Sequence, residues 1–259
     1  MPKIIFITGA TSGFGQATAY KFAANGYDLI INGRRTDRLQ TLADELEKKY
    51  NVAVLQLAFD VRIQQDVTDA IKNIPEKWQA INIFFNNAGL AMGRDYFEEG
   101  NVEDWDTMID TNVKGFLYVA KAVSQLMVKN KASSPAGHII NMGSVAGKEV
   151  YEKGNVYCAS KFAVDAISQG MRIDMLRHGI KVTAIHPGAA TTEFSLVRFK
   201  GDKATAESIY KGLKPLSAND VADVVYYCAS LPAHVCINDL TITCLQQANG
   251  IYFNRDTTG

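Results

Sequence analysis

Residues 8–15 read TGATSGFG and close the apolar run KIIFIT at 3–8. Glycines let the backbone turn sharply and approach a phosphate closely, and a helix beginning near residue 13 would offer free amide groups and a positive dipole end. The spacing is G-xxx-G-x-G and not GxGxxG, so taken alone it also fits an ordinary strand-to-helix turn. Its place after the first strand favours a dinucleotide site. The residues expected to contact the dinucleotide here are Gly9, Thr11, Ser12, Gly13, Phe14 and Gly15.

The rest of the chain alternates between short apolar runs and longer helical patterns. Continuous apolar runs are typical of strands buried on both faces of a parallel sheet, and the alternation predicts one doubly wound α/β domain over 1–259. Strands are expected at 3–8, 27–32, 52–59, 81–86, 137–142, 180–186 and 237–244, and helices at 13–25, 36–49, 64–73, 102–130 and 156–178. The irregular stretch 187–215 follows the sixth strand, so we expect it to be a loop-helix segment that covers the substrate.

The composition narrows the class of partner. Lys and Arg number 27, as do Asp and Glu, so the formal net charge is zero. This balance disfavours a nucleic-acid or polybasic membrane role, and no apolar stretch is long enough to predict a transmembrane helix. The cysteines form no CxxC pair and the four histidines do not cluster near them, so neither a disulfide framework nor a metal site is expected. With no signal-peptide pattern at Met1, we expect a cytoplasmic protein acting on a small molecule.

The second strand indicates which dinucleotide is bound. An acidic residue after this strand would hold the ribose hydroxyls of NAD, but Asp28 lies at the strand's start, and Arg34 and Arg35 follow its end. Arginine binds a phosphate dianion well, so the pair favours NADP(H), although two solvated loop arginines would look the same. Asp60 and Val61, past the third strand, are placed to contact the adenine.

Asn87 in the sequence Asn-Asn-Ala-Gly follows the fourth strand, at the edge of the sheet where ligands bind. This sequence is otherwise an ordinary turn signal.

Tyr157 and Lys161 lie four residues apart in a helical pattern, on one helix face. An ammonium beside a phenol pulls its pKa down, so the pair is a candidate acid–base unit, although a lone YxxxK is more often surface decoration. Ser144 lies 13 residues earlier and could donate to the same substrate oxygen, or it could simply cap a turn. Asn112 is a polar residue in an apolar helical pattern, either functional or a satisfied structural amide.

Together these motifs resemble the short-chain dehydrogenase/reductase family over essentially the whole chain. The resembling stretches are TGATSGFG, NNAG, Asn112, Ser144, YCASK and Pro187-Gly188. The resemblance implies a Rossmann-type seven-stranded parallel sheet and a tetramer or dimer. It implies that Tyr157 exchanges the proton, that Ser144 positions the reacting oxygen and that Lys161 binds the nicotinamide ribose. It further implies that Asn112 holds a relay water, and that Pro187, Gly188, Thr191 and Thr192 contact the nicotinamide end.

A narrower resemblance suggests the substrate. INGRRTDRLQ, NNAGLAMG, TEFSLVRFKGD and LPAHVCIN resemble NADP-dependent 3-hydroxy acid dehydrogenases, which oxidise serine, allo-threonine and related acids. A carboxylate needs a fixed cation, and Arg198 in the covering segment is a candidate, unless it faces solvent. A reductase of neutral ketones, diketones or aldehydes would keep every catalytic assignment. A dinucleotide sensor without turnover would not need all four of the catalytic residues.

The pattern at 156–178 also bears on assembly. Polar positions crowd one side of this helix, whereas apolar ones spread over more than half of its circumference. One core contact needs an apolar stripe of about 100° or somewhat more. We therefore expect a second buried face against a partner subunit, as in a homotetramer or homodimer, although a deeply covered helix would show the same pattern.

Overall fold

The computed structural model describes residues 2–131 and 137–256. Seven parallel strands form one sheet in the order β3-β2-β1-β4-β5-β6-β9, which confirms the predicted architecture. The order runs outward from β1 in one direction and from β4 in the other, so a crevice is expected at the carboxyl ends of these two strands. The strands are β1 (Ile4–Ile7), β2 (Asp28–Gly33), β3 (Val54–Ala58), β4 (Ile81–Asn86), β5 (His138–Met142), β6 (Lys181–Pro187) and β9 (Asp239–Ile242).

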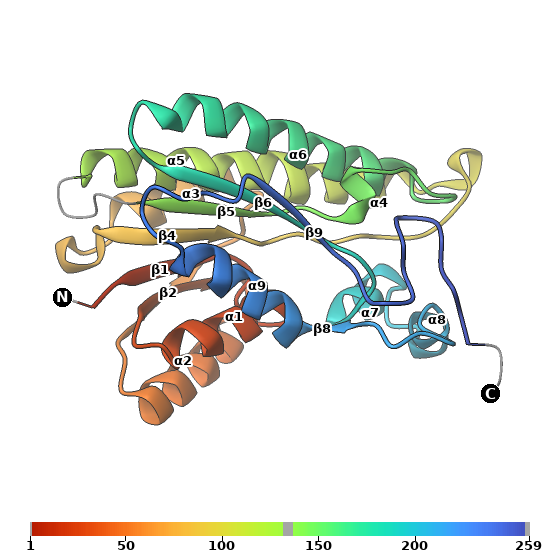
Figure 1. Ribbon diagram of the computed structural model, residues 1–259, viewed down its shortest axis with the longest axis horizontal. Coiled ribbons are helices and arrows are strands. Elements are labelled where there is room, and N and C mark those ends of the chain that lie inside the picture. The colour runs from red at the N-terminus through yellow and green to blue at the C-terminus, as the bar shows by residue number, and fades with distance from the viewer. Residues whose placement is uncertain (1, 132–136, 257–259) are drawn as a thin grey trace.

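Helices cover both faces of the sheet (Figure 1). One layer holds α1 (Gly13–Ala23), α2 (Thr36–Tyr50) and α9 (Ala218–Ser230), and the other holds α3 (Gln64–Lys72), α4 (Val102–Ile109), α5 (Phe116–Lys129) and α6 (Asn155–Leu176). Successive side chains of a strand point to opposite faces. Ile5 and Ile7 of β1 therefore join the core under the first layer, and Phe6 joins the core under the second.

The pattern at 102–130 predicted a single helix, and the structure interrupts it. A π-helical turn at Asp110–Gly115 separates α4 from α5 and contains Asn112. Such bulges inside α-helices are frequent at functional sites. A Cβ on Gly115 would fall 2.9 Å from a Val61 methyl group, so the turn packs tightly beside the predicted cleft.

Two other parts of the chain are more regular than predicted. No helix was expected at α9, which starts from a capping box between Ser217 and Asp220. The 187–215 stretch holds β7 (Ala190–Thr191), α7 (Glu193–Arg198) and α8 (Lys203–Ser208), and β7 pairs with β8 (Leu216–Ser217). These elements lie beyond the carboxyl ends of the sheet strands (Figure 1). None of the helices within the described residues has the length and apolar character needed to cross a bilayer.

Helix α6 turns part of its polar side chains toward the sheet. Lys161 and Ser168 are buried, and the Ser168 hydroxyl accepts a hydrogen bond from Asn141 of β5. Its outward side carries Phe162, Ile173 and Leu176, whose exposed fractions are 40%, 75% and 77%. The apolar surplus seen in the sequence therefore faces away from the core.

Candidate active site

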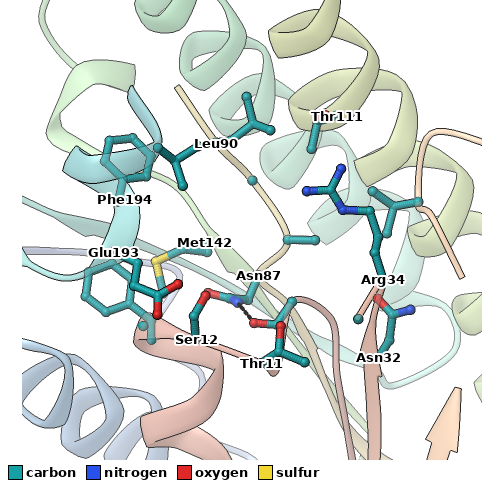
Figure 2. A pocket seen from close by; sticks show the side chains of 18 of the residues that line it. Thr11, Ser12, Asn32, Arg34, Asn87, Leu90, Thr111, Met142, Glu193 and Phe194 are labelled. Atoms are coloured by element: carbon teal, nitrogen blue, oxygen red, sulfur yellow. Dashed lines mark hydrogen bonds between the residues drawn. The ribbon is translucent and has the colours of Figure 1, made fainter. Parts of the chain in front are cut away.

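A cleft of about 300 Å³ opens at the carboxyl ends of β1 and β4. Figure 2 shows Glu193 and Phe194 of α7 on one side of it, and Asn32 and Arg34 at the end of β2 on the other. Most of the predicted dinucleotide contacts come together here. The predicted residues that line this cleft are Gly9, Thr11, Ser12, Gly13, Phe14, Arg34, Arg35, Asp60, Val61, Asn87, Tyr157, Lys161 and Thr192.

The glycine loop has the shape that a pyrophosphate requires. Gly9 and Gly13 have φ angles of 64° and 53°, which favour glycine, and α1 begins at Gly13 with its amide groups at the cleft. Gly15 does not line the cleft, but a Cβ there would fall 2.2 Å from the Gly9 carbonyl oxygen. The Asn87 side chain donates to the Thr8 carbonyl at 2.9 Å and so ties this loop to the end of β4. The cradle fits the diphosphate of a dinucleotide.

The two arginines after β2 present their guanidinium groups at the mouth of the cleft. The side chains of Arg34 and Arg35 are 60% and 45% exposed. Arg35 donates to the Thr11 hydroxyl at 3.3 Å, and Arg34 lies 3.8 Å from the Asp60 carboxylate. Burial opposes ionisation of Asp60, yet its hydrogen bonds to Arg62 lower its pKa. Asp60 thus lines the cleft as an ionised group engaged by Arg62, with an ion pair of 2.6 Å.

Three predicted catalytic side chains meet at the inner end of the cleft. Tyr157 and Lys161 come from the first turns of α6 and are both buried. The Tyr157 phenol lies close enough to the Ser144 hydroxyl for this neighbour to lower its pKa. Ser144 caps the short 3₁₀ turn Val145–Gly147, and its hydroxyl accepts from the Ala146 amide at 3.1 Å. Lys161 donates to the Met142 carbonyl at 3.0 Å, at the end of β5.

The pKa of the phenol differs from the prediction. Burial raises the pKa of Tyr157, the neighbouring Tyr151 adds to this, and the Ser144 hydroxyl and the Arg198 charge oppose it. In the protein by itself, burial outweighs the lowering of this pKa that was expected from the Lys161 ammonium. Burial also lowers the pKa of Lys161 to about 8.

Asn112 serves as a clamp in this structure. Its side-chain oxygen accepts from the Leu90 amide at 2.9 Å, and its amide donates to the Leu90 carbonyl at 2.7 Å and to Ser160 at 3.0 Å. A Cβ on Gly89 would fall 3.2 Å from this oxygen and 3.5 Å from the Lys161 ammonium. Asn112 therefore lies beside Lys161, but its side-chain groups are already satisfied, as in the structural alternative.

A second cavity of about 570 Å³ continues from the first on the other side of Tyr157. It receives the predicted residues Ser144, Pro187, Gly188, Thr192 and Arg198. Thr191 is an exposed residue of β7 and does not line either cavity. The second cavity is the natural place for a substrate, because it reaches the phenol from outside the dinucleotide cleft.

Arg198 lies against the phenol ring of Tyr157. Its guanidinium carbon is 5.3 Å from the ring centre of Tyr157 and 5.6 Å from that of Tyr151. Nη1 donates to the Tyr151 hydroxyl at 3.0 Å, and Nε donates to the Gly93 carbonyl at 3.3 Å. The half-buried cation is thus held in place by two rings and two acceptors.

Sequence reasoning missed much of the second cavity. Further residues that line it include Arg94, Tyr151, Glu152, Tyr210, Gln247 and Arg255. They come from two loops, the covering segment and the C-terminal tail, and none of them belongs to a periodic pattern or a recognisable motif.

The C-terminal tail also binds the covering segment. The Gln246 side-chain amide and the Asp256 backbone amide both donate to the Gly212 carbonyl, at 3.1 and 2.9 Å. Arg255 donates to the carbonyls of Ile209 and Lys211 at 3.1 and 2.6 Å. The tail thereby fixes the end of the covering segment beside the second cavity.

Comparisons with known proteins agree with this geometry. The family model described as short chain dehydrogenase matches residues 3–202. The chain is 43% identical over 246 residues to the NADP-dependent 3-hydroxy acid dehydrogenase of Escherichia coli K12, which covers 95% of this chain and 96% of that one. It is 42% identical over 248 residues to sulfoacetaldehyde reductase 2 of Chromohalobacter salexigens, covering 96% of each.

Among solved structures, the closed form of serine dehydrogenase complexed with NADP+ superposes with a TM-score of 0.88 at 42% identity. The match covers 98% of this chain and 100% of that one. The protein therefore belongs to the short-chain dehydrogenase family and is an NAD(P)-dependent oxidoreductase that acts on CH–OH groups.

Proposed function

We propose that this enzyme is an NADP(H)-dependent dehydrogenase of small 3-hydroxy acids such as serine, allo-threonine and 3-hydroxypropionate, and that it reduces the matching 3-oxo acids in reverse. The observation that carries the proposal is the fixed guanidinium of Arg198 against the ring of Tyr157. A carboxylate bound to this arginine would place a hydroxyl two carbons away near the phenol. Charge-assisted, bidentate contacts give arginine both affinity and orientation for a carboxylate.

The chain's own groups can perform the proton transfer. Tyr157 would accept the hydroxyl proton of the substrate, and Ser144, which lies next to the phenol, would donate to the same oxygen and stabilise its charge. Lys161 lies one helical turn further along α6 and would hold the nicotinamide ribose. When bound, the dinucleotide supplies the hydride acceptor. The glycine loop, Asn87 and the loop after Pro187-Gly188 would hold it.

NADP(H) is proposed over NAD(H) because Arg34 and Arg35 stand at the mouth of the cleft, and no acidic residue stands at the end of β2 to bind ribose hydroxyls. Relatives that are named NADP-dependent support this choice. Replacing both arginines by alanine should weaken the binding of NADP+ by several kcal/mol relative to that of NAD+, since each charge-assisted contact contributes about 1.5–3 kcal/mol. Titration of both coenzymes by fluorescence measures this, and an unchanged preference would reject the assignment.

A second candidate substrate is a small anionic aldehyde. Two relatives at 42% and 41% identity are sulfoacetaldehyde reductases. A sulfonate would meet the same guanidinium, and Arg94 and Arg255 add further positive charge to the cavity wall. The same charges disfavour the neutral ketones, diketones and aldehydes that remain the alternative class.

The deciding experiment is a panel of substrates with a matched pair of variants. We would follow NADP+ reduction with serine, allo-threonine, 3-hydroxypropionate, 3-hydroxyisobutyrate and neutral alcohols, and NADPH oxidation with sulfoacetaldehyde. Arg198→Met should raise KM for the anionic substrates by roughly tenfold or more, since a charge-assisted bond contributes about 1.5–3 kcal/mol. It should leave KM for neutral alcohols almost unchanged. Lys203→Met removes an exposed cation of the same segment and is the control.

Equal effects of Arg198→Met on charged and neutral substrates would refute the anion site. Coenzyme binding without any turnover, insensitive to Tyr157→Phe, would instead favour the dinucleotide sensor considered above. Faster turnover of neutral alcohols than of every acid would favour the neutral-substrate alternative.

We also propose that the protein is a homotetramer or homodimer that uses the outward side of α6. Phe162, Ile173 and Leu176 support this, since exposed apolar stripes of this kind mark interfaces. The four free cysteines support a reducing compartment such as the cytoplasm.

A further inference from the structure

A charged cluster lies behind the Ser144 turn and has no part in the mechanism above. His186 of β6 is fully buried, and its Nε2 is 3.0 Å from an Asp239 oxygen and 3.6 Å from an Asp165 oxygen. These three residues offer ligand atoms within 4.8 Å of one another, as a cation site would. Lys148 already places its ammonium 3.0 and 2.8 Å from the same two carboxylates. The cluster is therefore an ion-pair network in which a side chain takes the place of a metal.

The network contacts the turn that carries Ser144 at two points. Nδ1 of His186 lies 3.3 Å from the Ser144 carbonyl oxygen. The imidazole also packs on the preceding residue, because a Cβ on Gly143 would fall 2.4 Å from Nδ1. At the other end, Lys148 directly follows the 3₁₀ turn that Ser144 begins. The turn is thus held before and after its three residues.

The same network reaches the helix that carries the phenol. Asp165 lies on α6, one turn beyond Lys161 and two turns beyond Tyr157, so the three residues share one side of the helix. The Lys148–Asp165 ion pair therefore joins the Ser144 turn to the helix of Tyr157. Asp239 adds a tie to β9, the edge strand of the sheet.

We propose that His186 is a positioning residue which, through Lys148 and Asp165, fixes the Ser144 hydroxyl against the Tyr157 phenol. The inference rests on the roles proposed for Tyr157 and Ser144 and not on the identity of the substrate. Both ring nitrogens of His186 face acceptors, and a neutral ring has only one N–H. With the N–H on Nε2, the nitrogen that faces the two anionic carboxylates, the ring is anchored to Asp239 and holds the Ser144 turn by packing at Nδ1.

The test is the pH profile of alcohol oxidation by the His186→Gln enzyme, with any substrate that the wild type turns over. The Ser144 hydroxyl lowers the pKa of Tyr157. A misplaced serine should therefore move the ionisation of Tyr157, and with it the rise of activity with pH, to higher pH. We expect kcat at pH 8 to fall about tenfold, since small misplacements of reacting groups are costly, with the coenzyme dissociation constant unchanged. The other ionisable groups near Tyr157 are Tyr151, Arg198, Cys158 and Lys161, and the substitution leaves them in place.

Two variants guard against a loss of folding. His138→Gln is the matched control, because His138 is also buried but its Nε2 lies 2.7 Å from the Thr183 hydroxyl on the β5–β6 pair, away from the Ser144 turn. It should leave kcat and the pH profile unchanged. Asp239→Asn removes one anchor of the ring at a 40% exposed side chain and should produce a smaller shift in the same direction.

The double variant Ser144→Ala/His186→Gln separates the possible outcomes. If His186 acts through Ser144, adding His186→Gln to Ser144→Ala should change kcat by less than about twofold. A further full tenfold loss would overturn the positioning role, as would a His186→Gln profile identical to that of His138→Gln. Full activity of Ser144→Ala would refute the proposed roles of the catalytic residues themselves, which is a distinguishable result.

Discussion

The burial of Lys161 in the candidate site lowers the stability of the folded protein. Burial lowers the pKa of this lysine to about 8, so between pH 8 and 10.5 the unfolded chain binds a proton that the folded chain has lost. The free energy of unfolding must therefore rise with pH in this window. Below pH 8 the penalty for burying the ammonium is fully present, and above 10.5 it vanishes.

Replacing this lysine should stabilise an inactive enzyme. We predict that Lys161→Met raises the free energy of unfolding at pH 7 by about 2 kcal/mol, the protonation penalty less one hydrogen bond. The gain should fall with rising pH and become a loss of about 1 kcal/mol near pH 10.5, where only the missing hydrogen bond to the Met142 carbonyl remains. Urea unfolding at pH 7 and pH 10 measures it. A variant that is less stable at pH 7, or a gain that does not depend on pH, would contradict the prediction.

The predictions made from the sequence were least complete for individual residues of the site. Ser144, Tyr157 and Lys161 were found because their spacing matches a family motif. Arg198 was proposed because a carboxylate substrate needs a fixed cation and this arginine belongs to the covering segment. Arg94 and Tyr151 carry no such signal, since their place beside Tyr157 depends on how two loops fold. The raised pKa of Tyr157 was missed because burial is not visible in local spacing.

Helix α7 illustrates how one element links the two cavities. Its first residue, Glu193, crosses the mouth of the cleft and accepts from Arg38 Nη1 with both carboxylate oxygens at 3.1 Å. The same carboxylate lies 3.9 Å from Arg35 Nη2. All three side chains are about half exposed, so this link contributes less than about 1 kcal/mol. It nevertheless sets how much positive charge Arg35 offers to a phosphate.

The two partners of this link should change coenzyme preference in opposite directions. Glu193→Gln leaves the Arg35 charge uncompensated, so the affinity for NADP+ should rise a few-fold relative to that for NAD+. Arg38→Met releases Glu193 to pair with Arg35, so the affinity for NADP+ should fall a few-fold relative to that for NAD+. Loss of the link itself affects both coenzymes alike and cancels in the ratio of their dissociation constants. Shifts of the same sign in the two variants would refute this account.

Most helices and strands were predictable, and the exceptions have physical causes. The strands were found because both faces of a parallel sheet are buried, which produces continuous apolar runs. Helix α9 was missed because its β-branched valines favour a strand locally. Two usable signals were the helical spacing of its buried residues, Val221, Ala222, Val225 and Cys228, and the Ser217–Asp220 capping box. The π turn around Asn112 depends on contacts with Leu90 and Ser160, which are distant in sequence.

At the scale of the whole molecule, the apolar side chains that α6 leaves on the surface support the proposed assembly. Its polar residues serve the site and the sheet, which leaves Phe162, Ile173 and Leu176 on the surface. An exposed isoleucine and leucine would each lose the free energy of burial, about 1.5–3 kcal/mol per side chain, if no partner covered them. The sequence predicted that α6 has more apolar residues than one core contact needs, but not which side of the helix faces solvent. That side depends on the tertiary contacts that bury Lys161 and Ser168.

A charge on this side should disrupt assembly and leave the fold intact. We predict that Ile173→Asp shifts the protein to a smaller species in sedimentation equilibrium, with unchanged far-UV circular dichroism. Leu245→Asp places the same charge at another exposed apolar residue, on the tail, and is the comparison. A wild type that sediments as a monomer at micromolar concentration would rule out this interface.

The last described residues have a practical consequence for handling the protein. Gln246, Arg255 and Asp256 are bonded to the segment that borders the substrate cavity, whereas the amino end lies at the opposite end of the sheet (Figure 1). Anything fused to the carboxyl end would pull on the wall of the substrate cavity. Affinity tags and biosensor tethers therefore belong on the amino end, and kinetic constants from carboxyl-tagged material should be checked after the tag is cleaved.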